Sequence, residues 1–237
     1  MRIQLSFSMK AIPISYRLGT LSIIKEIIKN GSLDYYEKLF EKNKREMKPF
    51  SYSCFIRNLD IKNNQINGEE LTLTISSSSY EFILHLMNGC NRADVYYISD
   101  STLTLKSKRL LPKTNISKGN VIFKTPSMLI ENKFGKPLLA TDEAFEKEFQ
   151  YTANLILEKL YQRTPKQPIQ VLQTLMTKMV MKENLHQTQD KPLYLTANKG
   201  LIQLQGNAED LQYLYDSGVS MRRSLGFGLL ELVEEVN

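Results

Sequence analysis

The chain has 237 residues, of which 42% are hydrophobic and 24% are charged, as is usual for a folded protein of one large or two small domains. No apolar run approaches the roughly 18–20 residues of a membrane span, which argues against a membrane protein. The net charge is +6, and an excess of basic residues favours a polyanionic partner.

The positive charge is unevenly distributed along the chain. Residues 1–118 hold 18 Lys and Arg against 11 Asp and Glu, whereas residues 119–237 hold 13 against 14. The basic surface is therefore expected on the first half.

The first half predicts helices and strands in a regular order. Residues 2–9 alternate apolar and polar side chains as a strand does, and leucines and isoleucines recur within 16–30 at helical spacing, before a helix stop at Gly31. A charged helical stretch over 33–45 ends before Pro49. Further strands are expected at 50–57, 71–75 and 95–105, with a short helix at 80–90.

A turn-rich stretch over 111–120 divides the chain, and the second half repeats the pattern. A helix over 142–162 is expected with Thr141 or Asp142 as its N-cap. The remaining expected elements are strands at 121–130, 169–181, 193–204 and 225–233 and a short helix at 207–215. Each half then follows a β-α-β-β-α-β order. We predict an α+β protein with tandem ferredoxin-like (RRM-like) domains, residues 1–118 and 119–237.

Few residues suggest a disulfide, a metal or a secreted protein. Cys54 and Cys90 stand in apolar surroundings and are expected to be buried thiols. No C-x-x-C or H-E-x-x-H motif is present, so no metal and no cofactor are expected. The N-terminal residues lack the apolar core of a signal peptide, which predicts a cytoplasmic location.

A glycine-rich segment over Gly218–Gly228 precedes the last apolar run. Glycine permits positive φ and close backbone approach, and successive backbone N–H groups can form an anion-binding nest. The guanidinium groups of two adjacent arginines suit phosphate. The segment therefore predicts an RNA-binding loop made by Arg222, Arg223, Ser224, Gly226 and Gly228.

The segment Arg222–Gly228, R-R-S-L-G-F-G, resembles the C-terminal glycine-rich loop of the CRISPR repeat-processing endoribonucleases of the RAMP superfamily. A second segment, Lys48–Phe55, is similar to one that this family often has after its first helical region. The resemblance implies tandem ferredoxin-like domains and, as a partner, CRISPR repeat RNA in precursor and mature form. It also suggests subunits of a CRISPR effector complex as partners, leaves a homodimer open and implies no membrane partner.

The resemblance further implies a metal-free cut in which a ribose 2′-OH attacks the adjacent phosphate. Such a cut needs a base, a cation for the charged phosphorane and an acid for the leaving 5′-oxygen. Many members of the family place a histidine near the first helix, but residues 1–84 of this chain contain none. The candidate catalytic residues are therefore Lys48, which matches a lysine of the family, with Lys42 and Tyr36. Lys48 is expected to stabilise the phosphorane, because a lysine of ordinary pKa is a poor base at neutral pH.

Other basic residues and the two histidines allow more than one interpretation. Lys25 and Lys29 share a helix face that is either solvated or turned to RNA. His85 is expected to be packed and hydrogen-bonded. His186 begins a single H-x-T triplet, a pattern that the 2H phosphoesterases use twice, and an RNA contact remains open for it. The acid-free stretch 104–118 is either a solvated linker or a set of phosphate contacts by Lys106, Lys108 and Arg109.

The sequence thus predicts a metal-independent endoribonuclease that binds and cleaves CRISPR precursor RNA within its repeats, leaving 2′,3′-cyclic phosphate and 5′-OH ends. The alternative is a non-cleaving RAMP protein or effector-complex subunit that holds repeat RNA, which the missing first-half histidine favours. A third interpretation is an unrelated ferredoxin-like regulatory domain that binds small molecules. That protein would lack the salt-dependent RNA affinity of an RNA binder.

Overall fold

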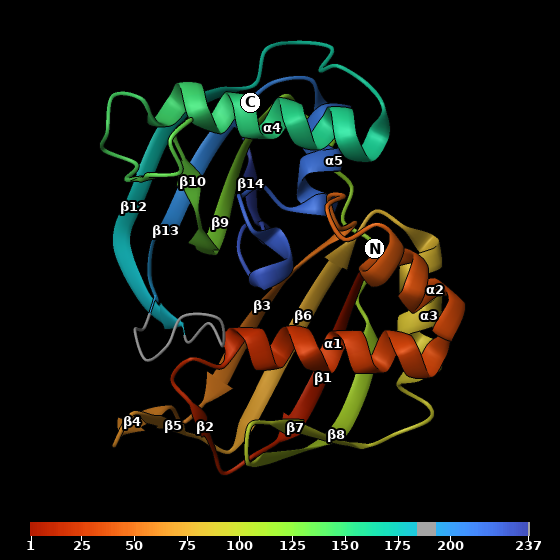
Figure 1. Ribbon diagram of the computed structural model, residues 1–237. Coiled ribbons are helices and arrows are strands. Elements are labelled where there is room, and N and C mark those ends of the chain that lie inside the picture. Colours follow the sequence, from red (N-terminus) through yellow and green to blue (C-terminus); the bar gives the residue numbers. More distant parts are fainter. Residues whose placement is uncertain (184–192, 237) are drawn as a thin grey trace. The chain divides into compact units, whose positions relative to one another are not determined.

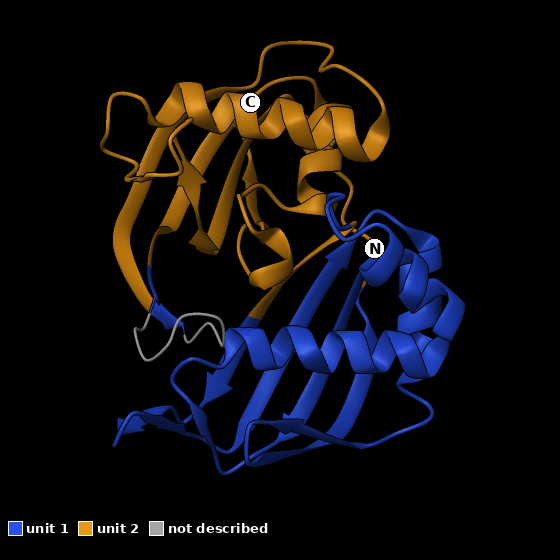
Figure 2. Cartoon of the chain, in the orientation of Figure 1, with its two compact units in different colours: residues 1–48, 54–111, 182–194 blue, residues 49–53, 112–181, 195–237 orange. Residues whose placement is uncertain are grey.

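The computed structural model describes residues 1–183 and 193–236. These residues form two compact units, which Figure 2 shows in different colours. The first unit comprises residues 1–48, 54–111 and 182–194, and the second comprises 49–53, 112–181 and 195–237. The units are therefore not two consecutive halves of the chain.

The first unit is built on a five-stranded sheet with strand order β3-β6-β1-β8-β7. The central strand β1 is antiparallel to both β6 and β8. Helix α1 lies across one face of this sheet (Figure 1). The elements of the sheet and its helices are β1 (Arg2–Ser8), α1 (Arg17–Gly31), α2 (Leu33–Tyr36), a π-helix (Glu37–Lys42), β3 (Phe50–Arg57), β6 (Glu70–Ser77), α3 (Tyr80–Gly89), β7 (Val95–Ile98) and β8 (Ser101–Leu110). A small separate sheet joins β2 (Ala11–Pro13), β5 (Gln65–Asn67) and β4 (Asp60–Lys62).

The second unit is built on a four-stranded sheet with strand order β12-β13-β9-β14, and α4 covers one of its faces (Figure 1). Its elements are β9 (Asn120–Met128), β10 (Ile130–Glu131), β11 (Pro137–Leu138), α4 (Phe145–Tyr161), β12 (Gln170–Glu183), β13 (Leu193–Gln205), α5 (Ala208–Ser217), a 3-10 turn (Arg223–Leu225) and β14 (Glu231–Glu235). Strands β10 and β11 form a separate hairpin.

Both main sheets place four strands in the same order. Counted along the chain within each β-α-β-β-α-β run, the strands lie in the order second, third, first, fourth, with β7 as an extra edge strand in the first unit. This arrangement confirms the predicted α+β fold with tandem ferredoxin-like units.

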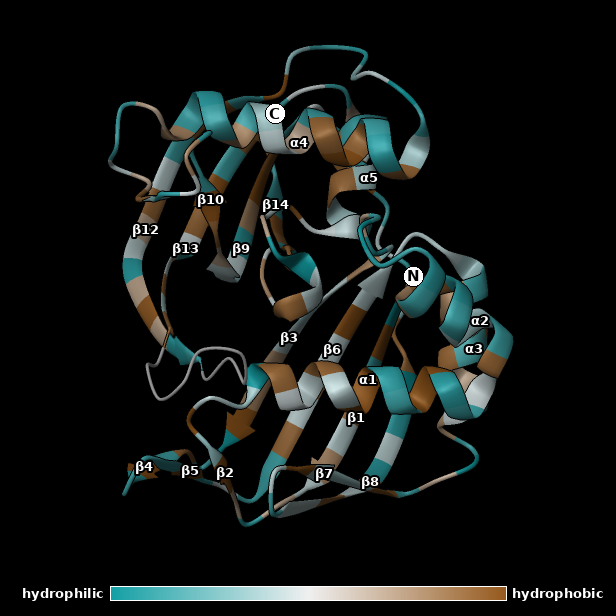
Figure 3. Ribbon diagram, viewed as in Figure 1, coloured by the Kyte–Doolittle hydropathy of each residue, from teal (hydrophilic) through white to brown (hydrophobic). Residues whose placement is uncertain are grey.

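Apolar periodicity explains why α1 packs on the first sheet. Its buried residues include Ile23, Ile24, Ile27 and Ile28, which recur at helical spacing. Figure 3 shows hydrophobic and hydrophilic residues alternating along this helix. In β1 the apolar residues alternate with polar ones, so that one side of the strand is fully buried.

Two glycines allow α1 and α3 to cross at very short range. A Cβ atom added to Gly31 would lie 1.9 Å from the His85 carbonyl oxygen, and one added to Gly89 would lie 1.8 Å from the Ile27 carbonyl oxygen. No larger residue fits at either position unless the helices move apart. The close crossing fixes the end of α1, from which α2 and the π-helix follow.

Two predicted elements of the first half differ from the structure. The helical stretch 33–45 is a single α-turn followed by a π-helix that ends at Lys42. The predicted strand 95–105 is two strands joined by a turn at Ser99, whose φ is +51°, and the second strand continues to Leu110. Lys106, Lys108 and Arg109 therefore lie in a sheet and not in a linker.

Two predictions in the second half are wrong for local reasons. Residues 225–233 do not form one strand, because the chain is buried as an irregular loop before β14 begins at Glu231. Neither Thr141 nor Asp142 is the N-cap of α4, which is Ala144, with no side-chain capping bond. The Asp142 carboxylate instead accepts a hydrogen bond from the Leu139 N–H at 2.7 Å, in the turn before the helix.

The prediction of buried thiols is confirmed for Cys90, whereas Cys54 is half-buried. Cys54 and Cys90 are free, and burial raises the pKa of each thiol to about 11. Across residues 1–183 and 193–236, no helix is long and apolar enough to cross a membrane.

Candidate RNA-binding surfaces

The glycine-rich loop connects α5 to β14 in the second unit. Three of its glycines have positive φ, at +74° for Gly218, +82° for Gly226 and +82° for Gly228. A Cβ atom added to Gly228 would lie 2.5 Å from both the Ser220 Cβ and the Val219 carbonyl oxygen. The loop conformation therefore requires glycine at 228 for both its dihedral angle and its space.

Backbone hydrogen bonds attach this loop to the residues at the end of β9. The Gly228 N–H donates to the Ser127 carbonyl at 2.7 Å, and the Met221 N–H donates to the Leu129 carbonyl at 2.8 Å. The Ser220 hydroxyl accepts from the Leu129 N–H at 2.8 Å. The N–H groups of Met221 and Gly228 are thus bonded within the unit and do not serve the expected anion-binding nest. Gly226 and Gly228 are buried and shape the loop.

The two adjacent arginines of the loop have opposite environments. Arg222 has 40% of its side chain exposed and forms a 3.4 Å ion pair with Glu131. Arg223 is 4% exposed and donates from Nη1 to the Ser217 carbonyl at 2.7 Å. Burial lowers the pKa of Arg223 to about 10. Only Arg222 is therefore placed to meet a ligand, with the half-buried Ser224 near it in sequence, whereas Arg223 anchors the loop to the end of α5.

Residues 49–53 of the segment Lys48–Phe55 approach the glycine-rich loop within the second unit. A Cβ atom added to Gly218 would lie 2.4 Å from the hydroxyl oxygen of Ser51, which is fully buried. Ser51 belongs to the short segment 49–53 that is part of this unit. The segment Lys48–Phe55 thus supports the base of the glycine-rich loop through Ser51.

Lysines surround two aromatic rings in the first unit. The Lys25 and Lys48 ammonium groups lie 5.3 Å and 6.0 Å from the centroid of the Phe40 ring. The Lys29 ammonium lies 5.7 Å from the Tyr36 ring centroid, and the two rings are 5.5 Å apart. These five residues, Lys25, Lys29, Tyr36, Phe40 and Lys48, are called the basic–aromatic cluster below. At such distances the ring faces attract the cations.

Lys48 is held in this cluster by the backbone at the end of the π-helix. Its ammonium donates to the carbonyl of Asn43 at 2.5 Å and to that of Lys44 at 3.4 Å. Burial lowers the pKa of Lys48, with a further contribution from the charge of Lys25 and against the opposing charge of Glu46. A positioned ammonium group of this kind is suited to stabilise negative charge that develops on a phosphate.

The predicted catalytic residues are only partly brought together. Lys48 and Tyr36 belong to the basic–aromatic cluster, whereas Lys42 is exposed and forms a 3.9 Å ion pair with Glu37 on its own π-helix. No pattern in the sequence indicated Phe40, whose ring joins Lys25 and Lys48. The signals that pointed to this surface were the four-residue spacing of Lys25 and Lys29 and the resemblance around Lys48.

His85 packs as predicted, but not all of its expected hydrogen bonding is present. Its ring stacks on that of Tyr35, with centroids 4.6 Å apart and planes 28° apart. Tyr35 is 7% exposed, and burial raises the pKa of its phenol. The His85 Nδ1 is buried and has no hydrogen-bond partner in the described part of the chain. His186 lies outside the described residues, so its open role is not addressed by the structure.

The three basic residues predicted to contact phosphate lie on β8. Lys106 is exposed at a β-bulge, where the partner of β1 changes from Ser107 to Leu105. The Lys108 ammonium donates to the Cys90 carbonyl at 3.1 Å and to the Asn91 side chain. The Arg109 guanidinium donates to the Gln4 side chain at 3.3 Å. Lys106 is thus exposed at the bulge, while Lys108 and Arg109 make local bonds.

Metal ligands do not gather in the part of the chain that the structure describes. Among residues 1–183 and 193–236, no group of three or more His, Cys, Asp or Glu side chains is arranged to hold a metal ion.

Comparison with known families gives a match over the second half of the chain. The family model described as CRISPR associated protein Cas6, C-terminal, matches residues 111–232, which is more than half of the chain. A search of curated protein sequences gave no match.

Solved structures match over the full length at low sequence identity. A Cas6-related protein from Pyrococcus furiosus is 20% identical with a TM-score of 0.81, over 100% of this chain and 99% of that one. A CRISPR associated protein Cas6 is 21% identical with a TM-score of 0.74, over 99% of each chain. A RAMP protein described as binding different RNA substrates is 17% identical with a TM-score of 0.80, over 99% of this chain and 100% of that one. At these identities the likeness concerns the fold.

Proposed function

Because the chain belongs to the Cas6 family, we propose that it binds CRISPR repeat RNA and cuts precursor RNA within its repeats without a metal ion. The observation on which this proposal depends is the basic–aromatic cluster, where three ammonium groups meet two aromatic rings. Aromatic rings and cations together suit RNA, whose bases stack and whose phosphates are negative.

In the proposed reaction the O2′–P bond forms as a base removes the proton from the 2′-OH. The P–O5′ bond then breaks, an acid protonates O5′, and the products end in a 2′,3′-cyclic phosphate and a 5′-OH. Lys48 stabilises the charged phosphorane, helped by Lys25, whose ammonium lies over the same ring. Tyr36, beside Lys29, is the phenol available for proton transfer in this cluster.

The two units have different roles in this proposal. The first unit supplies the cations and the reacting groups through the basic–aromatic cluster. The second unit binds RNA through Arg222, which the glycine-rich loop exposes, while Arg223 and the glycines keep the loop in shape. Lys106, exposed at its bulge, adds a phosphate contact that positions RNA without reading its sequence.

One observation favours a second candidate function, a non-cleaving protein that holds repeat RNA. The imidazole of His85 is stacked on Tyr35 with a buried Nδ1 and is not among the residues of the cluster. A site with lysines but no imidazole lacks the side chain best suited to proton transfer near neutral pH. Such a protein would bind repeat RNA with the same surfaces and leave it intact.

The test uses the purified full-length protein, labelled repeat RNA and EDTA. We expect one discrete cut, a product with a cyclic phosphate, and loss of the cut when the nucleotide at that site carries 2′-deoxyribose. A double substitution, Lys48→Ala with Lys42→Ala, should abolish the cut if these lysines act in the reaction. Tight binding without any cut would instead support the non-cleaving function, and cleavage only after a divalent metal is added would contradict the proposed mechanism.

A further inference from the structure

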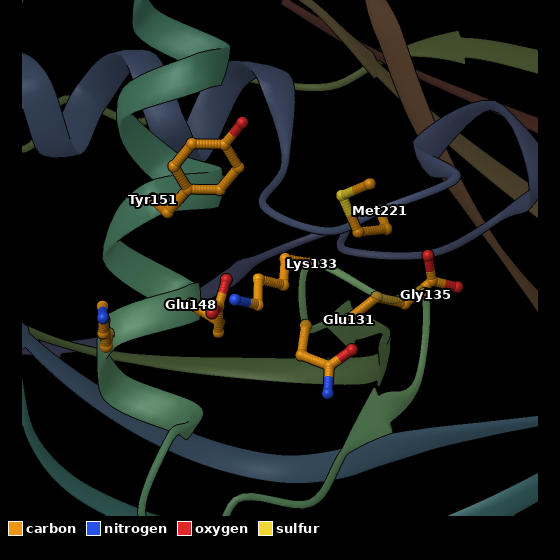
Figure 4. Close-up of a pocket in the computed structure, with 8 residues that line it drawn as sticks. Glu131, Lys133, Gly135, Glu148, Tyr151 and Met221 are labelled. Carbon is orange, nitrogen blue, oxygen red and sulfur yellow. The ribbon is translucent and has the colours of Figure 1, made fainter.

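A cavity of about 570 Å³ lies in the second unit next to the glycine-rich loop. One wall is α4, which supplies Glu148 and Tyr151, and another is the β10–β11 hairpin (Figure 4). Met221 of the glycine-rich loop closes a third side. The residues lining the cavity are Glu131, Asn132, Lys133, Gly135, Lys147, Glu148, Tyr151 and Met221.

The hairpin turn beside this cavity is rigidly built. The Asn132 side-chain oxygen accepts hydrogen bonds from the N–H groups of Phe134 at 2.9 Å and Lys136 at 3.1 Å. The Gly135 N–H donates to the Asn132 carbonyl at 2.8 Å, and Gly135 has a φ of +76°. A turn with this many internal bonds holds its outward side chains in fixed directions.

This turn exposes an aromatic ring and a cation together. Phe134 is 82% exposed, more than any other large hydrophobic residue that the structure describes. The Lys133 ammonium lies 5.0 Å from the centroid of that ring, and Figure 4 shows the Lys133 side chain extending toward α4. Tyr151, which lines the cavity, is a second exposed aromatic residue, with 61% exposure. Water-exposed rings on a fixed frame, beside lysines, are what base stacking on a protein requires.

The charges of the cavity suit a base edge inside and a phosphate at its rim. Glu148 is half-buried and Glu131 has only 11% of its side chain exposed, and both offer oxygens that accept hydrogen bonds. A phosphate would be repelled by these carboxylates, whereas an amino group on a base would donate to them. Lys133 and Lys147 are exposed, and Arg222 lies at the Glu131 side of the cavity through their 3.4 Å ion pair.

We propose that this cavity is a nucleobase-binding subsite for one unpaired RNA nucleotide. The base stacks on the Tyr151 ring, its amino group donates to the Glu148 carboxylate, and the adjacent phosphate lies between Lys133 and Arg222. An adenine, cytosine or guanine base fits this arrangement, whereas uracil has no amino group to donate. The inference rests on the proposed RNA-binding function and adds a specificity-determining contact on α4.

The experiment combines protein variants with abasic RNA. A series of repeat RNAs, each with one abasic nucleotide, is titrated with the full-length protein while fluorescence anisotropy is recorded. For the unmodified protein we expect one abasic position to weaken binding by about tenfold, the size of one lost base stack. Tyr151→Ala should weaken binding of intact RNA by the same factor and should show no further loss with that abasic RNA. Tyr151→Phe, which keeps the ring, should bind as the unmodified protein does.

A matched control separates this site from a general effect of losing a surface tyrosine. Tyr97, in the first unit, is 59% exposed, and Tyr97→Ala should leave both the affinity and the abasic profile unchanged. Uridine at the sensitive position should weaken binding to the unmodified protein but not to Glu148→Gln, whose amide can donate to a carbonyl. Unchanged affinity of Tyr151→Ala, or an unchanged abasic profile in that variant, overturns the inference. No binding of repeat RNA by the unmodified protein overturns the proposed function itself.

Discussion

The two units share one strand order, yet the candidate site of one is formed by backbone and that of the other by side chains. In the second unit the glycine-rich loop is defined by its backbone, with three positive-φ glycines and bonds to the end of β9. In the first unit the basic–aromatic cluster is made by side-chain ends, which meet over two rings. The same fold thus supports a backbone frame in one unit and a cluster of charged side chains in the other.

The difference predicts that substitutions in the two regions fail for different reasons. A change in the loop should first affect folding, because its atoms are closely packed and leave no room for a larger side chain. A change in the cluster should first affect RNA chemistry, because the proposed reaction uses its lysines. The predictions below test this division, beginning with the largest effect.

Gly228→Ala should give the largest loss of stability. The new Cβ would lie 2.5 Å from the Ser220 Cβ and the Val219 carbonyl oxygen, and Gly228 has a φ of +82°. We expect a loss of about 3 kcal/mol or more in the free energy of unfolding, measured by urea denaturation.

Gly135→Ala is the matched control for this substitution. Its φ of +76° is similar, but a Cβ at this position would have nothing within 4 Å. The expected loss is therefore only the cost of the backbone conformation, about 1 kcal/mol. Equal losses for the two variants would show that the loop yields to an added methyl group and is not rigid.

Lys48→Ala should slow RNA cleavage about a hundredfold, the usual effect of removing one group that stabilises transition-state charge. RNA affinity should fall much less, because Lys25 and Lys29 remain. Single-turnover cleavage at saturating protein separates the two effects. Lys44→Ala is the control, since Lys44 is exposed and gives only its carbonyl to Lys48.

The pH dependence of this step has a defined sign. Because burial lowers the pKa of Lys48, its ammonium form is lost at a lower pH than that of an ordinary lysine. Cleavage should therefore decline on the alkaline side, and Lys48→Arg, which keeps its charge, should shift that decline to higher pH. Equal cleavage by Lys48→Ala and the unmodified protein would exclude Lys48 from the reaction.

Arg223→Ala should reduce stability and Arg222→Ala should reduce RNA binding, although the two residues are adjacent. Loss of the buried Arg223 removes its bond to the Ser217 carbonyl and should reduce stability by about 2 kcal/mol. Loss of Arg222 should leave the melting temperature unchanged, weaken RNA binding and reduce the salt slope of log K by about one. Binding isotherms at several salt concentrations, beside thermal melts, measure both effects. A reduced salt slope in both variants would contradict the assignment of Arg223 to the interior.

Much of the fold could be predicted from local patterns, and particular residues explain where this failed. Strand β3 agrees with the predicted range 50–57, because Pro49 limits its start. The run 225–233 is as apolar as a strand, but residues 226–230 form a buried loop. The path of this loop depends on hydrogen bonds to Ser127 and Leu129, which are far away in sequence. In β8 a bulge at Lys106 interrupts the register, and residues 106–110 are all exposed. Apolar and polar residues therefore do not alternate in this part of the strand, and the pattern did not predict it.

The candidate site was harder to predict than the fold, because it depends on whether each side chain is buried or exposed. Arg222 and Arg223 are identical in type and adjacent, and nothing local indicates that only the second is buried. Helical spacing placed Lys25 and Lys29 on one face, but only the π-helix brings Phe40 to Lys25 and Lys48. The predicted roles of Lys48, Lys42 and Tyr36 stay predictions.

His85→Phe should have the smallest effect and sharpens the comparison most. The phenyl ring keeps the stack on Tyr35 and removes an Nδ1 that is buried without a hydrogen bond, so stability should stay within about 1 kcal/mol of the unmodified protein. Cleavage should also be unchanged, because the proposed reaction uses the lysines and Tyr36 of the first unit. His85→Ala, which loses the stack, should lower the melting temperature and serves as the control for packing. If His85→Phe folds normally but no longer cleaves, the imidazole transfers a proton, and the chemistry of the first unit extends from the basic–aromatic cluster to α3.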